Sequence, residues 1–265
     1  MNVKFIILSS LISILLIIAL FAPFIVPFDP YVQNLNNALT PPNNIHLFGT
    51  DQYGRDLLSR VIIGAQITVL SSLMITFITT AIGTTIGIIC GYFGGKIDTI
   101  LMRISDVFLA FPGMVLAIAI AGMLGGSVLN AVIALTLISW PKFARLARAQ
   151  VLTVKSSTFI AAARLNNCSN MKIMFKHIFP NIIGIILITA ILEIGTIIME
   201  IAGLSFLGLG AVPPSAEWGA MISGSKSMLQ TAPWLILPPG MAIFISVSLF
   251  NLFGDGAPAN IRLPS

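Results

Sequence analysis

Residues 159–181 read FIAAARLNNCSNMKIMFKHIFPN, and they interrupt a chain that is otherwise a succession of apolar runs. The basic charge gathers around them, because residues 142–176 contain seven Lys or Arg and neither Asp nor Glu. Residues 156–158 are Ser-Ser-Thr, side chains that cap helix N-termini, so an Ala-rich helix is predicted over 159–165. The basic stretch therefore begins with a short helix rather than with another apolar span.

A second short helix is predicted after a bend. Asn166-Asn167 ends the first helix, because Asn tolerates the left-handed backbone better than any residue except Gly. Ser169 is placed to cap the second helix, and Pro180 ends it or begins the next span. Four apolar side chains of this helix fall on one face: Met171, Met174, Phe175 and Ile178. Two short amphipathic helices joined at a bend are predicted to form an element, between the spans, that a soluble partner protein can bind and move.

Composition decides the class of protein. The chain has 265 residues, of which 57% are hydrophobic and 9% are charged, and its mean hydropathy is +1.00. Soluble domains contain about 25% charged residues, so a water-soluble fold is excluded and several membrane spans are indicated. The net charge of +5 does not indicate nucleic-acid binding, because the excess lies in one loop between apolar runs.

Residue types that commonly serve in catalysis, metal binding or nucleotide binding are scarce. Cys90 and Cys168 are predicted to be free thiols, because one lies in a span and the other in the basic loop. His46 and His177 are too few and too far apart to form a hydrolytic triad or a metal cage. Residues 94–96 read GGK but lack the Gly and the Ser/Thr that the Walker pattern requires around them. Neither catalysis nor nucleotide binding is expected of this chain.

Six membrane spans are expected from the apolar runs, each about 20 residues or more in length. The first is too long for a signal peptide, and no A-x-A cleavage site follows it. Both termini are expected inside, because this arrangement places eleven of the fourteen Lys and Arg, Arg262 included, on the inner side. The predicted spans are Phe5–Pro27, Ile63–Tyr92, Ile100–Met123, Leu129–Leu146, Ile182–Ala202, and a sixth from Pro233-Trp234 to Phe253.

Two features inside the spans concern packing and charge. Gly83, Gly87, Gly91 and Gly95 recur at four-residue spacing, which predicts a bare helix face for close packing. Glu193 and Glu200 are seven residues apart and so lie on one helical face of the fifth span. A carboxylate at membrane depth faces either a transport path or a neighbouring helix. The two alternatives stay open for Glu200, and packing is favoured for Glu193.

Residues 159–181 resemble the EAA loop of bacterial ATP-binding cassette (ABC) importer permeases, which docks into an ATPase subunit. The flanking sequence narrows the resemblance to the dipeptide/oligopeptide/nickel permease family, and to its second, C-type permease. Ala161 stands where the family has Glu, and Asn167 where it has Gly. The resemblance implies an ATPase contact by Ala161, Ala162, Ala163, Arg164, Asn167, Phe175, His177, Pro180 and Asn181.

Further motifs follow in the order of that family. They are GTDQYGRDLLSR at 49–60, LSFLGLG at 204–210 after Glu200, the PP-x-x-x-WG signature of Pro213, Pro214, Trp218 and Gly219, and FNLFGDG at 250–256. Residues 257–265 form a shorter and less charged tail than the family's. A role in the translocation path or its gate is open for Glu200, Asp51, Arg55, Asp56 and Trp218. The alternative for the first loop is a self-paired Asp/Arg surface cluster, while Trp218 is expected to anchor an outer loop that partly re-enters the membrane interface.

The resemblance implies an all-α polytopic membrane protein with the type I ABC importer permease fold, six transmembrane helices and cytoplasmic termini. It divides the chain into a first span with an extracytoplasmic loop (1–60), a five-span permease core with a cytoplasmic coupling loop at 142–181 (61–256), and a tail (257–265). The implied partners are a homologous second permease, two ABC ATPases that bind ATP and Mg, an extracytoplasmic substrate-binding protein and the bilayer of the bacterial cell membrane. No cofactor or metal is expected on this chain itself.

The sequence leaves alternatives open for the transported substrate and for the class of membrane protein. The family carries peptides or metal chelates of the nickel and cobalt type, and the sequence does not choose between them. One rival is an ATP-independent secondary transporter or channel that uses Glu200 and Glu193 as its ionisable relay. Another is a structural membrane protein, which would need no such basic element between its spans.

Overall fold

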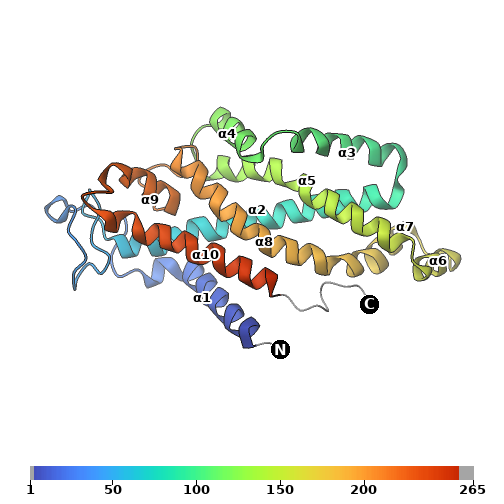
Figure 1. Cartoon of the computed structure of the whole chain (residues 1–265), viewed down its shortest axis with the longest axis horizontal. Helices are drawn as coiled ribbons and strands as arrows, with labels where there is room; N and C mark the ends of the chain where they lie inside the picture. Colours follow the sequence, from blue (N-terminus) through green and yellow to red (C-terminus); the bar gives the residue numbers. More distant parts are fainter. Residues whose placement is uncertain (1–2, 257–265) are drawn as a thin grey trace.

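The computed structural model describes residues 3–256, so the predicted tail at 257–265 lies outside the described residues. This part of the chain is an elongated bundle of helices (Figure 1), and it contains no β-strand, only an isolated bridge between Thr50 and Asp56. The main helices are α1 (Val3–Ile25), α2 (Leu57–Phe93), α3 (Gly95–Leu109), α4 (Gly113–Leu124), α5 (Val128–Lys155), α6 (Thr158–Leu165), α7 (Asn170–Lys172), α8 (Phe179–Phe206), α9 (Trp218–Ser225) and α10 (Leu237–Asp255). Short turns of helix complete the order: η1 (Leu35–Asn37), η2 (Ile173–Ile178), η3 (Lys226–Met228) and η4 (Pro233–Leu235).

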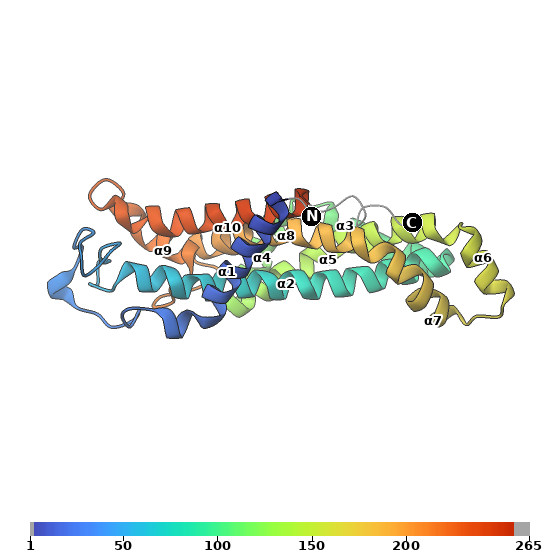
Figure 2. The same cartoon turned by 90° about the horizontal axis from the view of Figure 1, so that it is seen from below.

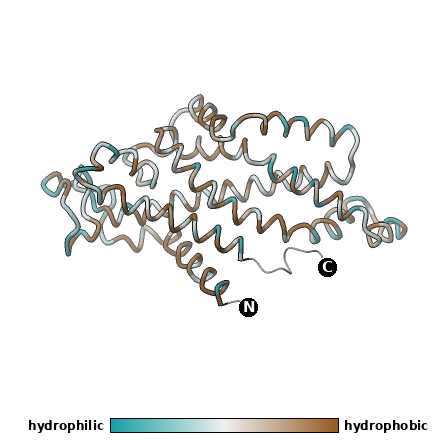
Figure 3. Tube along the Cα trace, viewed as in Figure 1, coloured by the Kyte–Doolittle hydropathy of each residue, from teal (hydrophilic) through white to brown (hydrophobic). Residues whose placement is uncertain are grey.

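The bundle has two polar ends and an apolar middle. The loop between α1 and α2 lies at one end of the long axis, and α6 with α7 projects at the other (Figure 2). Hydrophilic residues gather at both ends, while hydrophobic residues predominate between them (Figure 3). This distribution is that of a membrane protein whose spans run along the bundle axis.

Four helical runs are long and apolar enough to cross a membrane, and α3 with α4 makes a fifth if the bent pair counts as one span. These runs are Val3–Ile25, Leu57–Phe93, Asn170–Phe206 and Pro233–Asp255. The predicted fourth span corresponds to α5, which is less apolar because Lys142, Arg145 and Arg148 lie in its second half. The predicted count of six spans and the cytoplasmic position of both termini stay predictions.

The third predicted span is not one helix. A bend of 87° separates α3 from α4, so the expectation of a continuous helix over Ile100–Met123 is wrong. The break falls at residues 110–112, where Pro112 takes the N-cap position of α4 with a non-helical ψ of 120°. Proline lacks an amide hydrogen and disfavours helical backbone in the residue before it, which explains the break.

The predicted glycine face packs α2 against α5. A Cβ atom at Gly83 would lie 2.5 Å from the Trp140 carbonyl oxygen, and one at Gly87 would lie 2.4 Å from that of Ala144. A Cβ at Gly91 would lie 2.7 Å from Val151 Cβ of α5, whereas Gly95 lies outside this face and begins α3, with no atom within 4 Å of its Cβ position. Three of the four glycines therefore bring the two helix backbones together, as small residues do in membranes.

Candidate functional site

The coupling segment, residues 156–181, forms the helix–bend–helix that the sequence predicts. Its first helix is α6, and Asn167 then takes a φ of 53°, the left-handed conformation expected there. The amide of Asn167 donates to the Arg164 carbonyl oxygen (3.0 Å), and that of Cys168 donates to Ala163 (3.1 Å). These bonds satisfy carbonyl groups at the helix end and fix the bend.

The second helix continues into the membrane span. Ser169 caps it as predicted, with its hydroxyl accepting from the Lys172 amide at 3.3 Å. The helix then passes through η2, a π-helical segment, and joins α8, so Pro180 begins the span rather than ending the helix. The four apolar residues do not share one environment: Met174 and Ile178 are buried, whereas Met171 and Phe175 are about 60% exposed. A π turn contains more residues than an α turn, so it shifts the predicted face.

The inner face of the coupling segment is fixed to the bundle. Ile160, Ala163, Ile173 and Met174 belong to one buried cluster with α2 and α5. Tyr92, at the end of α2, is the polar centre of this contact: its hydroxyl donates to Asn170 Oδ1 at 2.7 Å, and its carbonyl oxygen accepts from Lys155 Nζ at 2.5 Å. The Arg164 guanidinium lies 5.6 Å from the Tyr92 ring centroid. The sequence interpretation missed Tyr92, although a tyrosine at the end of a span is a recognisable signal.

The outer face leaves most of the predicted ATPase contacts available. Side chains of Ala161, Ala162, Arg164, Asn167, Phe175 and Pro180 are exposed, His177 and Asn181 are partly buried, and Ala163 is buried. Asn181 Nδ2 donates to the His177 carbonyl oxygen at 2.6 Å, which closes the first turn of α8. Their role in binding an ATPase stays a prediction.

A groove borders the coupling segment on the membrane side. It has a volume of about 720 Å³ and lies between α2 and α8, with Met171, Met174 and Phe175 at one end. The bundle therefore covers the segment on one side only.

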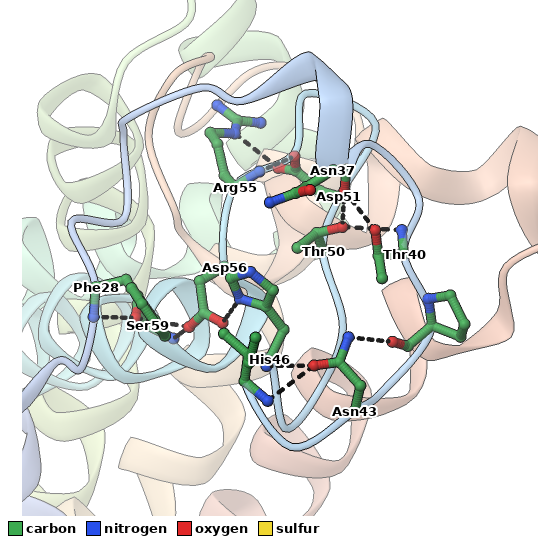
Figure 4. Close-up of polar contacts among 12 residues, drawn as sticks. Phe28, Asn37, Thr40, Asn43, His46, Thr50, Asp51, Arg55, Asp56 and Ser59 are labelled. Carbon is green, nitrogen blue, oxygen red and sulfur yellow. Dashed lines mark hydrogen bonds and ion pairs between the residues drawn. The ribbon is translucent and has the colours of Figure 1, made fainter.

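A polar network folds the loop at the opposite end (Figure 4). Asp56 caps α2: its carboxylate accepts from the Ser59 amide (2.8 Å) and hydroxyl (2.7 Å), and His46 Nδ1 lies at 2.9 Å. Asp51 accepts from Arg55 Nε at 2.7 Å, and both of these side chains are buried. The Asp/Arg pairing that the sequence allowed is present, but the cluster is buried rather than on the surface. A role of Asp51, Arg55 and Asp56 in a gate stays a prediction.

Two long side chains join the first turns of α2 to other segments at this end of the bundle. Arg60 donates to the carbonyl oxygens of Pro30 (2.9 Å) and Ser215 (3.3 Å). Trp218 is 1% exposed, and its Nε1 donates to the Val61 carbonyl oxygen at 2.9 Å. The expectation of an anchor at the membrane interface is therefore wrong, because this ring packs inside the protein against Gly64.

Glu217, next to Trp218, is a buried carboxylate that the sequence interpretation did not single out. It is fully buried and caps α9, accepting from the Ala220 amide (2.9 Å) and from Thr68 Oγ1 (3.0 Å). Burial raises the pKa of the Glu217 carboxyl, against hydrogen bonds that lower it.

The intramembrane carboxylates lie apart from both ends. Glu193 is buried and forms an ion pair with Lys142 of α5, so the favoured packing interpretation has a partner on a neighbouring helix. Glu200 is partly buried and lies two turns farther along α8. No hydrogen bond or ion pair joins Glu200 to Asp51, Arg55, Asp56 or Trp218 among the described residues, although Gly219, next to Trp218, packs against Ala202 of the same helix. Lys142 was predicted only as one of the basic residues of the loop, and its pairing could not be seen from spacing.

The comparisons with known proteins agree with this architecture. The family model described as "Binding-protein-dependent transport system inner membrane component" matches residues 83–261. The dipeptide transport system permease protein DppC of Alkalihalophilus pseudofirmus is 43% identical over 250 residues, which cover 93% of this chain and 81% of that protein. The glutathione transport system permease protein GsiD of Escherichia coli O6:K15:H31 is 44% identical over 247 residues, covering 92% of this chain and 80% of that protein.

Solved structures are similar in fold. A chain of the MetNI methionine ABC transporter, in an inward-facing conformation, superposes with a TM-score of 0.62 and 20% sequence identity. The superposition covers 78% of this chain and 95% of the other. At this identity the likeness establishes the fold alone.

Proposed function

Since this chain belongs to the family of binding-protein-dependent transport system inner membrane components, we propose that it carries small peptides across the bacterial cell membrane. The chain is a multi-pass permease subunit of an ABC importer. Relatives named for dipeptide and glutathione transport support a peptide cargo. The family assignment also removes the rival interpretation of an ATP-independent carrier built on Glu200 and Glu193.

The observation that carries the proposal is the coupling segment at one end of the bundle. Its exposed residues include Phe175, at the end of the groove between α2 and α8, and Arg164, and an apolar ring and a cation suit a complementary surface on a soluble ATPase subunit. Its inner face is fixed to α2 through Tyr92 and is continuous with α8. A displacement of the segment would therefore move two membrane helices, and ATP-driven closure of the ATPases would switch the spans between outward and inward states.

The other functions of the importer are assigned to other subunits. A homologous second permease completes the passage, two ATPase subunits bind ATP and Mg and perform hydrolysis, and an extracytoplasmic binding protein delivers cargo. This chain needs no cofactor for such a role. A nickel- or cobalt-type chelate is the competing cargo, but the relatives named above give it no support.

Co-purification from native membranes tests the coupling role. ATPase subunits are expected to accompany the tagged wild-type chain and to be reduced at least about tenfold by Phe175→Glu, because burying an unpaired carboxylate in an interface is costly. His177→Glu is expected to act in the same direction. Val32→Glu is the control, since Val32 is 64% exposed in the loop at the opposite end. Equal recovery of ATPases with Phe175→Glu, or none with the wild type, would contradict the proposal.

A further inference from the structure

A mixed-charge cluster lies in the middle of the bundle. Lys142 is at the midpoint of α5 and Glu193 at the midpoint of α8, each about 20 Å from the ends of its helix at 1.5 Å per residue. The Glu193 side chain is 7% exposed, whereas the Lys142 side chain is 52% exposed. The pair therefore buries its carboxylate and presents its ammonium group on the surface of the subunit.

Glu200 extends the cluster along α8. It lies seven residues after Glu193 on the same helical face, about 10 Å farther along the axis. Its side chain has no hydrogen bond or ion pair within the described part of the chain, and the charges that act on it are those of Glu193 and Lys142. Thr196, between the two carboxylates, is exposed.

The break between α3 and α4 lies beside this cluster. The Phe108 ring, just before the break, is 5.9 Å from the Trp140 ring of α5. Met114, just after the break, packs closely against Gly203 of α8. A Cβ atom added at Gly203 would lie 2.7 Å from the methyl carbon of Met114. Residues 110–112 of the break are exposed, and the break lies near the middle of the long axis (Figure 1).

Neither feature is compatible with lipid. Lys142 lies within the predicted fourth span, Leu129–Leu146, where an exposed ammonium group is costly in hydrocarbon, and ionisable residues inside spans face a bundle interior or a water-filled cavity. Non-helical backbone at membrane depth is likewise tolerated only inside protein or along such a cavity. Two independent observations thus exclude lipid from this face and leave it to the protein interior or a water-filled cavity of the assembled importer.

We propose that this face lines the aqueous passage, where Lys142 binds the carboxylate and Glu200 the ammonium end of a zwitterionic peptide. The proposal rests on the function proposed above and specifies the cargo. An offset of about 10 Å matches an extended peptide of about three residues, since each residue spans about 3.5 Å. Lys142 has donors to spare for a second carboxylate while it stays paired with Glu193, which positions its ammonium group.

Thiol modification in the reconstituted importer tests the two parts of this inference. The Thr196→Cys variant, made with Cys90→Ala and Cys168→Ala, is treated with a charged, membrane-impermeant thiol reagent. Its thiol is expected to react at least about tenfold faster than that of Ile14→Cys, because thiolates form and charged reagents enter only where water does. Ile14 is the matched control, since it is 52% exposed on the apolar helix α1.

Peptide protection then identifies the ligand. Trialanine is expected to slow modification, while its N-acetylated and C-amidated forms protect about tenfold less, because each lacks one charge-assisted hydrogen bond. Adding Glu200→Gln, or Lys142→Gln together with Glu193→Gln, is expected to remove the protection, and Met199→Leu to leave it unchanged. The double change avoids an unpaired buried carboxylate.

The outcomes separate the inference from the proposed function. ATP-driven uptake of trialanine by the same vesicles tests the function. Uptake with an unreactive thiol at Thr196→Cys, or with equal protection by blocked and free peptides, overturns the inference and leaves the function standing. Absence of ATP-driven peptide uptake by the wild type contradicts the function and, with it, the inference.

Discussion

At the scale of single residues, the bend of the coupling segment depends on Asn167 and its positive φ of 53°. A β-branched side chain in this conformation costs on the order of 1–3 kcal/mol, so Asn167→Val is expected to loosen the bend, whereas Asn167→Gly should preserve it. Trypsin cleavage at Arg164 and Lys172 should become about tenfold faster in the valine variant, because local opening governs proteolysis. Asn166→Val is the control, since Asn166 has a φ of −81°. Equal cleavage of the two valine variants would contradict a special role for Asn167.

Glu217 gives a prediction on pH at the same scale. Because burial raises the pKa of the Glu217 carboxyl above its unfolded value of about 4.3, the folded state binds more protons than the unfolded state. The stability that this group contributes is therefore full below that value and is lost as pH rises toward the folded pKa. Glu217→Gln keeps an acceptor for the Ala220 amide and offers Thr68 Oγ1 an amide donor in place of an acceptor, without this titration. The thermal midpoints of the variant and the wild type are measured in detergent between pH 4.5 and 8. The midpoint of the variant should rise relative to that of the wild type as pH increases, as expected for the ionisation of about one buried carboxyl group. A constant difference between the two midpoints would contradict the prediction.

At the scale of helices, the contact between α2 and α5 depends on bare backbone. Gly87→Ala places a methyl group 2.4 Å from the Ala144 carbonyl oxygen, so it is expected to destabilise the protein by about 1–3 kcal/mol. Gly122→Ala makes the same chemical change in α4, where no atom lies within 4 Å, and should be neutral or slightly stabilising. Thermal unfolding of the two purified variants checks the difference. If both lose stability equally, the glycine face does not determine the packing.

The same helices indicate what the sequence could predict. Apolar length and cap residues were sufficient for α1, α2, α6 and α10, because these features act locally along the chain. The break before α4 was missed, although Phe111-Pro112 carries its signal. A proline alone does not identify a break in this chain, because Pro141 and Pro180 lie in helices that continue. The pairing of Lys142 with Glu193 was not predictable, because it joins helices whose relative rotation depends on the whole packing. The burial of Trp218 depends on Gly64 of α2 in the same way.

At the scale of the whole molecule, the two polar ends have different tasks in this account. At one end lies a loop in which Asp51 pairs with Arg55, next to Arg60, which donates to the carbonyl oxygens of Pro30 and Ser215. At the other end projects the coupling segment, which is continuous with α8. Between them lie the cluster at Lys142 and the break in the third span. Under the proposed function, this arrangement would separate delivery of cargo, its passage, and the coupling to ATP hydrolysis along one axis.

ATP-driven uptake in vesicles tests this account most directly. The chain is reconstituted with its second permease, ATPases and binding protein, and import of a radiolabelled dipeptide is followed. The account predicts accumulation that requires both ATP and the binding protein, and that excess nickel chelate does not reduce. Accumulation driven by an ion gradient without ATP, or import of the chelate in place of the peptide, would contradict it.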